Sequence, residues 1–204
     1  MLSIISTPIG NLNDISLRAI TALKDADVIL SEDTRHTGLL LKHFEIPHKP
    51  LVSFYDEVEQ QKMADILESA KTLKVALVSD SGTPLISDPG YKLVREAIKL
   101  GIKVESIPGP CAAIVALTVS GLPPDKFTFW GFPKKNKVEE AVGTNIYYVS
   151  PHKLLKFLKL LKTPSIVVCR ELTKVFEEVW TGSPTEAMIK FVNPRGEFVV
   201  LWHV

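Results

Sequence analysis

The chain has 204 residues and a formal net charge of +1, and 46% of its residues are hydrophobic, so it can bury a core as one large or two small domains. Its composition gives no support to nucleic-acid binding, because strong polyanion binders usually carry a basic excess. Two cysteines lie far apart in apolar runs, which indicates reduced thiols rather than a disulfide framework or a zinc site. No signal segment or membrane-spanning run is recognisable, so we expect a soluble, cytoplasmic protein.

The first half of the chain alternates short apolar runs with amphipathic segments. A helix should begin at about Ser16, with Leu17, Ile20 and Leu23 on its inner face. This alternation of strands and helices predicts a mostly parallel sheet. The expected strands cover residues 2–6, 28–31, 51–54, 75–78 and 103–107, and the later helices cover 33–41, 58–72 and 91–100, with another that ends near 119.

Residues 79–90 form the most distinctive stretch of the sequence, SDSGTPLISDPG. It follows an apolar strand and contains two glycines, two prolines and two aspartates, so it can continue neither as a strand nor as a helix. Open α/β sheets bind their ligands in loops of this kind, at the carboxyl ends of core strands. An ordered turn capped by hydroxyl and aspartate side chains is the alternative explanation.

A second domain should follow the sequence Gly121-Leu122-Pro123-Pro124, because adjacent prolines after a glycine are typical of a boundary. The predicted domains are therefore 1–121 and 122–204. Ser183 and Glu186 have the spacing of a capping box that opens a short helix. The remaining predictions are strands at 126–131, 145–149, 165–170 and 197–204, a helix at 151–161, and a polar basic stretch at 134–140.

Three other groups of residues have two explanations each. His36 and His43 could share a helix face, but no third ligand accompanies them, so no metal site is predicted. The lysine-rich segment 151–162 could lie on a membrane or on RNA, or could be an ordinary domain helix. The acids and arginine of 32–35 could meet a substrate or could form an N-cap with a local ion pair.

Six blocks of sequence, in a fixed order along nearly the whole chain, resemble the motifs of the ribosomal RNA small subunit methyltransferase I family, within the tetrapyrrole methylase superfamily. The blocks are STPIGNLNDIS at 6–16, SEDTRHT at 31–37, VSDSGTPLISDPG at 78–90, IPGP at 107–110, YVSPHK at 148–153 and RELTK at 170–174. The resemblance implies two α/β domains with S-adenosyl-L-methionine in the cleft between them, and a homodimer. It also implies methyl transfer to the 2'-hydroxyl of a cytidine in the decoding region of 16S rRNA.

The resemblance also implies a set of cofactor contacts. A carboxylate at Asp80 can accept hydrogen bonds from a cationic ligand, and small side chains at Cys111 and Ala112 leave room for adenine. For catalysis, Glu32 or Asp33 is the candidate general base, and Arg35 is the candidate residue for holding a phosphate or the ribose. The implied cofactor contacts are Ile9, Val78, Ser79, Asp80, Thr83, Cys111, Ala112, Val149 and Leu172.

The chain departs from the family pattern in three places. The segment between Gly131 and Asn145 is short, Val149 stands where an acid is usual, and the chain ends at Val204 without the extension that many members carry. Since phosphate contacts dominate RNA affinity, we favour the 30S subunit over free rRNA as the substrate. The alternatives are a methyltransferase of the same superfamily that acts on a small molecule such as a tetrapyrrole, and a non-catalytic, cofactor-binding module of ribosome assembly.

Overall fold

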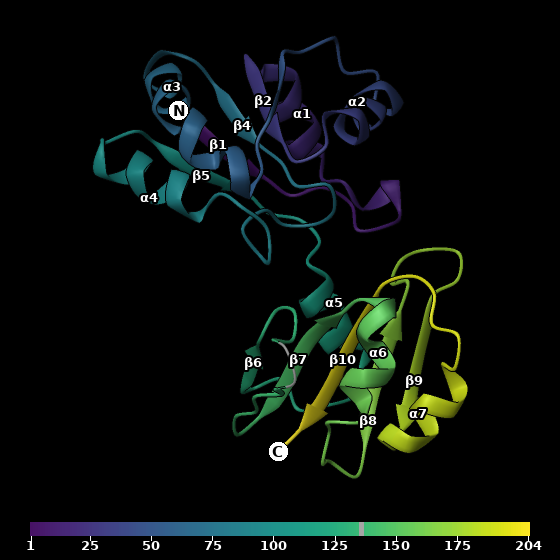
Figure 1. Cartoon of the computed structure of the whole chain (residues 1–204). Coiled ribbons are helices and arrows are strands. Elements are labelled where there is room, and N and C mark those ends of the chain that lie inside the picture. The colour runs from purple at the N-terminus through teal and green to yellow at the C-terminus, as the bar shows by residue number, and fades with distance from the viewer. Residues whose placement is uncertain (135–136) are drawn as a thin grey trace. The chain divides into compact units, whose positions relative to one another are not determined.

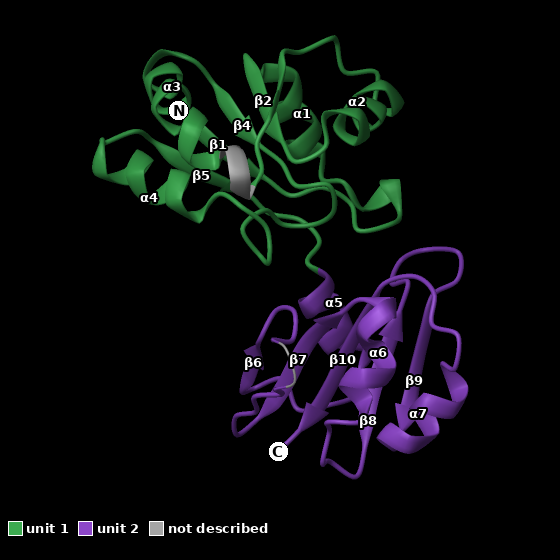
Figure 2. Cartoon of the chain, in the orientation of Figure 1, with its two compact units in different colours: residues 1–111 green, residues 112–204 purple. Residues whose placement is uncertain are grey.

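The computed structural model describes residues 1–134 and 137–204, with only the backbone of residues 56–58 (Figure 1). Part of the predicted basic stretch, residues 135 and 136, lies outside this description. The chain forms two compact units, Met1–Cys111 and Ala112–Val204 (Figure 2). Each unit contains a five-stranded sheet with helices, which confirms the predicted α/β fold.

The division between the units lies earlier in the chain than the glycine and prolines at 121–124. Helix α5 (Ala112–Val119) belongs to the second unit, because it contacts two strands of that unit's sheet. The backbone N–H of Ala113 also donates a hydrogen bond to the Tyr148 hydroxyl, 3.0 Å away. The turn signal at 121–124 therefore marks the end of this helix.

The sheet of unit 1 is parallel throughout, as the alternation of strands and helices predicts. Its strand order is β3-β2-β4-β1-β5, so the first strand lies between the fourth and the fifth. Leu2 is paired with both Val75 and Val104, which sets the register of these three strands. The strands are β1 (Leu2–Ile5), β2 (Val28–Ser31), β3 (Leu51–Ser53), β4 (Val75–Leu77) and β5 (Val104–Ile107).

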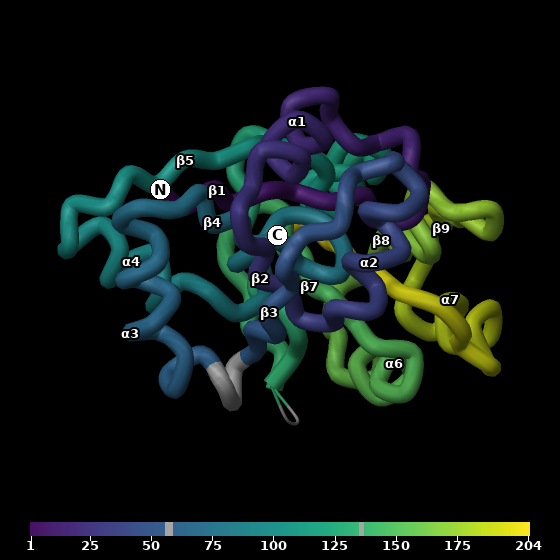
Figure 3. The backbone as a smooth tube through the Cα atoms, turned by 90° about the horizontal axis from the view of Figure 1, so that it is seen from above, coloured from purple at the N-terminus to yellow at the C-terminus, as the bar shows by residue number. Residues whose placement is uncertain are grey.

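Helices cover both faces of this sheet, because its strands carry apolar side chains on both sides. Helices α3 (Asp56–Thr72) and α4 (Tyr91–Lys99) lie side by side on one face, with Leu2 and Ile4 beneath them (Figure 3). Helices α1 (Leu17–Asp25) and α2 (Thr34–His43) pack on the other face. A short 3-10 helix, η1 (Leu12–Asp14), precedes α1.

One prediction about α1 is wrong. Leu17 is 83% exposed, and the side chains that face the sheet are those of Ala19 and Leu23. Ser16 is the N-cap, with its side chain accepting a hydrogen bond from the N–H of Ala19. This cap fixes where the helix begins, and the first helical residue then points away from the core.

The sheet of unit 2 has the order β6-β7-β10-β8-β9. Only β6 and β7 run parallel, and the other described pairs are antiparallel. The sequence did not predict β9, an edge strand whose side chains are all partly or fully exposed. The strands are β6 (Phe127–Phe129), β7 (Thr144–Val149), β8 (Ile166–Arg170), β9 (Glu178–Gly182) and β10 (Phe198–His203).

Helices α6 (Pro151–Leu158) and α7 (Pro184–Lys190) pack on one face of this sheet. Trp202 is fully buried there and stacks on Tyr147, with ring centroids 5.6 Å apart. Leu154 and Phe157 of α6 face the same core, which makes the lysine-rich segment an ordinary domain helix. Ser183 and Glu186 form the predicted capping box. No helix in the described part of the chain is long and apolar enough to cross a bilayer.

Candidate functional site

Thr83 joins three loops at the carboxyl ends of β1, β4 and β5. Its hydroxyl donates to the carbonyl oxygen of Pro110 at 2.8 Å and lies 3.0 Å from the hydroxyl of Ser6. A threonine hydroxyl has one proton, so Ser6 must be the donor in the second bond. Because β1 lies between β4 and β5, the loops that follow these strands meet at one edge of the sheet.

Thr7 holds the beginning of the loop at 79–90. Its backbone N–H donates to the carbonyl oxygen of Gly82 at 2.9 Å, and its hydroxyl donates to the carbonyl oxygen of Ser79 at 3.2 Å. The Ser79 hydroxyl in turn donates to the carbonyl oxygen of Gly82 at 3.1 Å. These bonds give the loop a defined backbone conformation.

The third loop lies close to the first because residue 109 is glycine. A Cβ atom at Gly109 would lie 2.8 Å from the Cβ of Ser6, which is closer than packed carbon atoms come. Any larger residue would push the loop at Pro110 away from Ser6 and would disturb the bonds of Thr83.

The loop after β2 is joined to the same edge through Asp80. The backbone N–H of Asp33 donates to Oδ1 of Asp80 at 3.0 Å. Asp33 itself is the N-cap of α2 and accepts from the backbone N–H of Arg35 at 2.9 Å. The Arg35 side chain forms an ion pair with the same carboxylate, with Nη2 2.7 Å from Oδ2. Of the two explanations for 32–35, the structure therefore contains the cap and the local ion pair.

The hydrogen bond from the Arg35 side chain holds the pKa of Asp33 well below its usual range. A carboxylate with such a low proton affinity is a weak general base, since efficient proton transfer needs a pKa near the working pH. Glu32, the other candidate, has an exposed side chain beside this cap. The structure thus distinguishes Glu32 from Asp33 as candidate bases, although the sequence presents the two acids as equivalent.

Unit 1 contains six of the predicted cofactor contacts, and three of them, Ile9, Val78 and Ser79, have buried side chains. Val78 faces the core and the Ser79 hydroxyl is bonded within its own loop, so only their backbone atoms could touch a cofactor. The six residues are Ile9, Val78, Ser79, Asp80, Thr83 and Cys111.

The other three predicted contacts belong to unit 2. Ala112 begins α5, and Val149 ends β7 with its side chain in the core. Leu172 follows β8 and is 5% exposed. For Val149, as for Val78, only the backbone could contact a ligand. Among the described residues no cluster of His, Cys, Asp and Glu could hold a metal ion.

Ser6, Thr7 and Pro110 belong to the site, although the sequence predicts no individual role for them. Ser6 ends a predicted strand, and Thr7 and Pro110 lie in loops that follow predicted strands, but their importance depends on the strand order, which the sequence does not reveal. Two hydroxyl residues directly after the first strand are the signal that could have identified them.

The chain is similar to known proteins along most of its length. Residues 1–187 match the model of the family described as Tetrapyrrole (Corrin/Porphyrin) Methylases. The chain belongs to the tetrapyrrole methylase family. Within that family it resembles proteins named ribosomal RNA small subunit methyltransferase I. The one from Vibrio cholerae is 44% identical, over all of this chain and 77% of its own length. The one from Thermotoga maritima is 40% identical, over 98% of this chain and 96% of its own length.

Solved structures of other tetrapyrrole methylase folds support the architecture. A diphthine synthase superposes with a TM-score of 0.78 at 15% identity, over 99% of this chain and 89% of its own. The uroporphyrin-III-C-methyltransferase of Thermus thermophilus superposes with a TM-score of 0.71 at 19% identity, over 98% of this chain and 93% of its own. At such identities the likeness establishes the fold alone.

Proposed function

We propose that this chain is a methyltransferase that transfers the methyl group of S-adenosylmethionine to the 2'-hydroxyl of a cytidine ribose in the decoding region of 16S rRNA. The observation that carries this proposal is the 44% identity, over the whole chain, to a protein named ribosomal RNA small subunit methyltransferase I. We further propose that it acts as a homodimer on the cytoplasmic 30S subunit.

The loops of unit 1 have the chemistry that S-adenosylmethionine requires. Asp80 uses Oδ1 to accept from Asp33, and its Oδ2 has no hydrogen-bond partner among the described residues, so it can accept from the ammonium group of the cofactor. Ile9 packs against this loop, since its Cγ2 lies only 3.1 Å from where a Cβ at Gly82 would stand. The bonds of Thr83 hold these groups in place before binding, which lowers the entropic cost of binding.

The remaining cofactor contacts are proposed through the backbone of Val78, Ser79 and Val149 and through Thr83, Cys111, Ala112 and Leu172. The location of the cofactor between the two units stays a prediction.

The sulfonium supplies an activated methyl group, so the chain's main contribution is to align the ribose oxygen with it. Alignment of this kind contributes up to about 7–11 kcal/mol in favourable cases. A ribose hydroxyl is a poor nucleophile, and a base that accepts its proton adds a further factor of about 10² to 10⁴. We assign this role to Glu32, because the ion pair with Arg35 lowers the pKa of Asp33 and makes Asp33 a weak base. Arg35, held in that ion pair, stays the candidate for contact with the RNA backbone.

A small-molecule substrate such as a tetrapyrrole is the competing proposal. Its support comes from the solved structures with 15% and 19% sequence identity to this chain, and such likeness establishes the fold alone. No residue of the described site favours it, and we do not adopt it.

The test is transfer of labelled methyl groups to 30S subunits and to free 16S rRNA, both from cells that lack this enzyme. We expect label on the ribose of one cytidine in the decoding region, with more label on 30S subunits. Intact binding of S-adenosylmethionine without transfer to either substrate would contradict the proposed reaction. Analytical ultracentrifugation of the purified chain tests the proposed homodimer.

A further inference from the structure

In the loop between β8 and β9, both neighbours of Leu172 have an unusual backbone conformation. The residues on either side of it, Glu171 and Thr173, have φ angles of 51° and 67°. Residues with side chains rarely adopt this left-handed region, and they keep it only where the surrounding structure holds them. Contacts of the neighbouring residues must therefore fix the backbone on both sides of Leu172.

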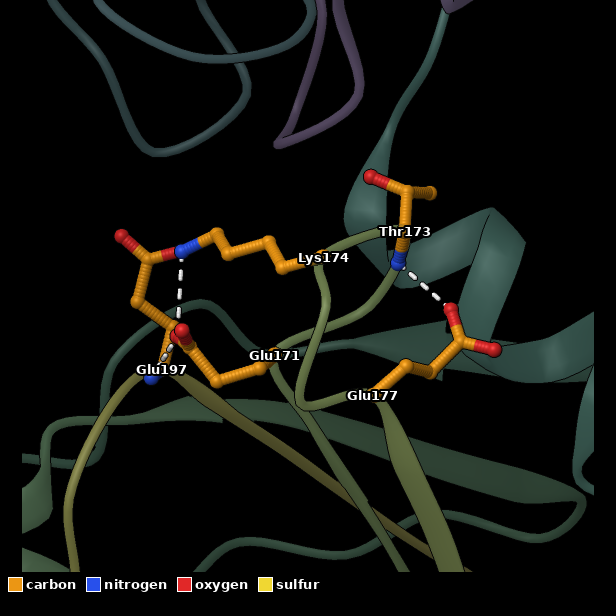
Figure 4. Close-up of polar contacts among 5 residues, drawn as sticks. All are labelled: Glu171, Thr173, Lys174, Glu177 and Glu197. Carbon is orange, nitrogen blue, oxygen red and sulfur yellow. Dashed lines mark hydrogen bonds and ion pairs between the residues drawn. The ribbon is translucent and has the colours of Figure 1, made fainter.

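An ion-pair cluster provides the first of these contacts (Figure 4). Nζ of Lys174 donates to Oε1 of Glu171 at 3.0 Å and to Oε2 of Glu197 at 2.9 Å. The same Oε1 of Glu171 accepts from the backbone N–H of Glu197 at 2.8 Å. We call Glu171, Lys174 and Glu197 the Leu172 latch, since together they tie the loop to the chain that enters β10.

Two further features lead to the same conformation. The backbone N–H of Thr173 donates to the carboxylate of Glu177, which closes the loop on itself. A Cβ at Gly196, where φ is +87°, would lie 2.6 Å from the Glu171 side chain, so only glycine leaves room for this carboxylate.

The Lys174 side chain stays charged within this cluster. Burial by itself lowers the pKa of Lys174, but its hydrogen bonds to Glu197 and Glu171 outweigh burial and raise the pKa. The ammonium group is therefore charged throughout the neutral range.

The latch is exposed to solvent at its outer end. The side chain of Glu197 is 73% exposed, that of Lys174 is 29% exposed and that of Glu171 is 19% exposed. The outer pair, Lys174 and Glu197, contributes little to the free energy of unfolding, because water and salt screen it. What these contacts determine is the local position of the backbone at Leu172.

We propose that Glu171, Lys174 and Glu197 are positioning residues that hold Leu172 where it contacts S-adenosylmethionine. This inference rests on the proposed function, and specifically on the proposed contact of Leu172 with the cofactor. None of the three residues needs to touch the cofactor. Their effect is to keep the loop in its binding conformation before the cofactor arrives, so that cofactor binding does not have to order it.

The experiment measures the Kd for S-adenosylmethionine by calorimetry on the full chain carrying Lys174→Met. The matched control is Lys190→Met, which removes an ion pair of the same unit, with Nζ 2.6 Å from Glu178. If the loop of Lys174→Met adopts the binding conformation about a tenth of the time, the Kd of this variant for S-adenosylmethionine rises about tenfold. We expect the Kd of the control to equal that of the wild type and the two variants to share one thermal midpoint.

Kinetics distinguish positioning from a general loss of structure. With Lys174→Met, KM for S-adenosylmethionine should rise while kcat at saturating cofactor and KM for 30S subunits stay at wild-type values. Lys174→Arg keeps the positive charge between the two carboxylates and should restore the Kd. Gly196→Ala tests the latch independently, since it displaces the Glu171 carboxylate without removing any charge.

The outcomes distinguish failure of the proposed function from failure of the proposed role of the latch. Wild-type chain that binds no S-adenosylmethionine would overturn the proposed function itself. Wild-type binding that Lys174→Met leaves unchanged would overturn the latch alone.

Discussion

The backbone N–H of Asp33 donates a hydrogen bond to Oδ1 of Asp80, 3.0 Å away, across the ends of the neighbouring strands β2 and β4. The loop at Asp33 thus orients the carboxylate of Asp80. The bond uses a single oxygen of Asp80 and points the second oxygen elsewhere. Because the donor is a backbone group, this orientation of the Asp80 carboxylate does not require a second side chain to lose its rotamer entropy.

Replacement of Asp80 separates its charge from its hydrogen bond. Asp80→Asn keeps an oxygen for the Asp33 N–H but removes the negative charge, so the Kd for S-adenosylmethionine should rise about 10- to 100-fold. The thermal midpoint should change by less than about 2 °C. Asp80→Ala should lower both affinity and midpoint. Calorimetric titration and thermal melts measure these effects, and unchanged affinity in Asp80→Asn would remove Asp80 from the cofactor site.

The two acids before α2 should differ in catalysis. Glu32→Gln removes the proposed base and should lower kcat for methyl transfer to 30S subunits about 10²-fold or more. Asp33→Asn keeps a good N-cap and should affect kcat far less. Single-turnover assays at saturating cofactor measure the chemical step directly. Equal loss of rate in both variants would contradict the assignment of the base to Glu32.

Asp33 should also contribute to stability in a pH-dependent way. The Arg35 side chain lowers the pKa of Asp33 in the folded chain, so the folded chain binds this proton less tightly than the unfolded chain. The contribution is present above the unfolded pKa of about 3.9 and is lost as the pH falls below it. Asp33→Asn should therefore have a lower thermal midpoint than the wild type near neutral pH, with the gap closing below about pH 4. A gap that stays constant with pH would exclude this linkage.

Gly109→Ala should disturb the meeting of the three loops. The new Cβ would stand 2.8 Å from the Cβ of Ser6, and relieving that contact should destabilise the chain by about 1–3 kcal/mol. Gly38→Ala, within α2, is the control, because the nearest atom to a Cβ there is Cδ1 of Leu51, 4.0 Å away. It should stabilise the chain by about 0.5–1 kcal/mol through helix propensity. Urea denaturation measures both, and equal stability of the two variants would contradict the close packing at Gly109.

The two thiols should react at very different rates. Burial raises the pKa of Cys169 to about 12, so about one thiol in ten thousand is ionised at pH 8. Cys111 is only partly buried and should take up a thiol reagent first. If Cys111 contacts the cofactor, saturating S-adenosylmethionine should slow its labelling. The Cys111→Ser variant is the control, and fast labelling of that variant in the native state would contradict the burial of Cys169.

Much of the local structure follows from local sequence. The cap at Ser16, the capping box at Ser183 and the end of β4 before the loop at 79–90 all depend on residues within a few positions of one another. Such contacts form with short loops and involve few alternatives, so their sequence patterns predict them directly. Each block that resembles the ribosomal RNA small subunit methyltransferase I family is also a short local pattern, so the sequence indicates the family without the fold.

Other features depend on partners that are distant in the chain. The position of β1 between β4 and β5 decides that Ser6, Thr83 and Pro110 meet, and no local pattern encodes a strand order. The weakly buried edge strand β9 forms because β8 offers it a pairing partner. The sequence by itself determined most of the strands, helices and loops, together with the family to which they belong. Only the tertiary structure decided which loops meet, that Asp33 donates to Asp80, and that Glu197 lies beside Glu171 and Lys174, because each of these depends on contacts between residues that the fold alone brings together.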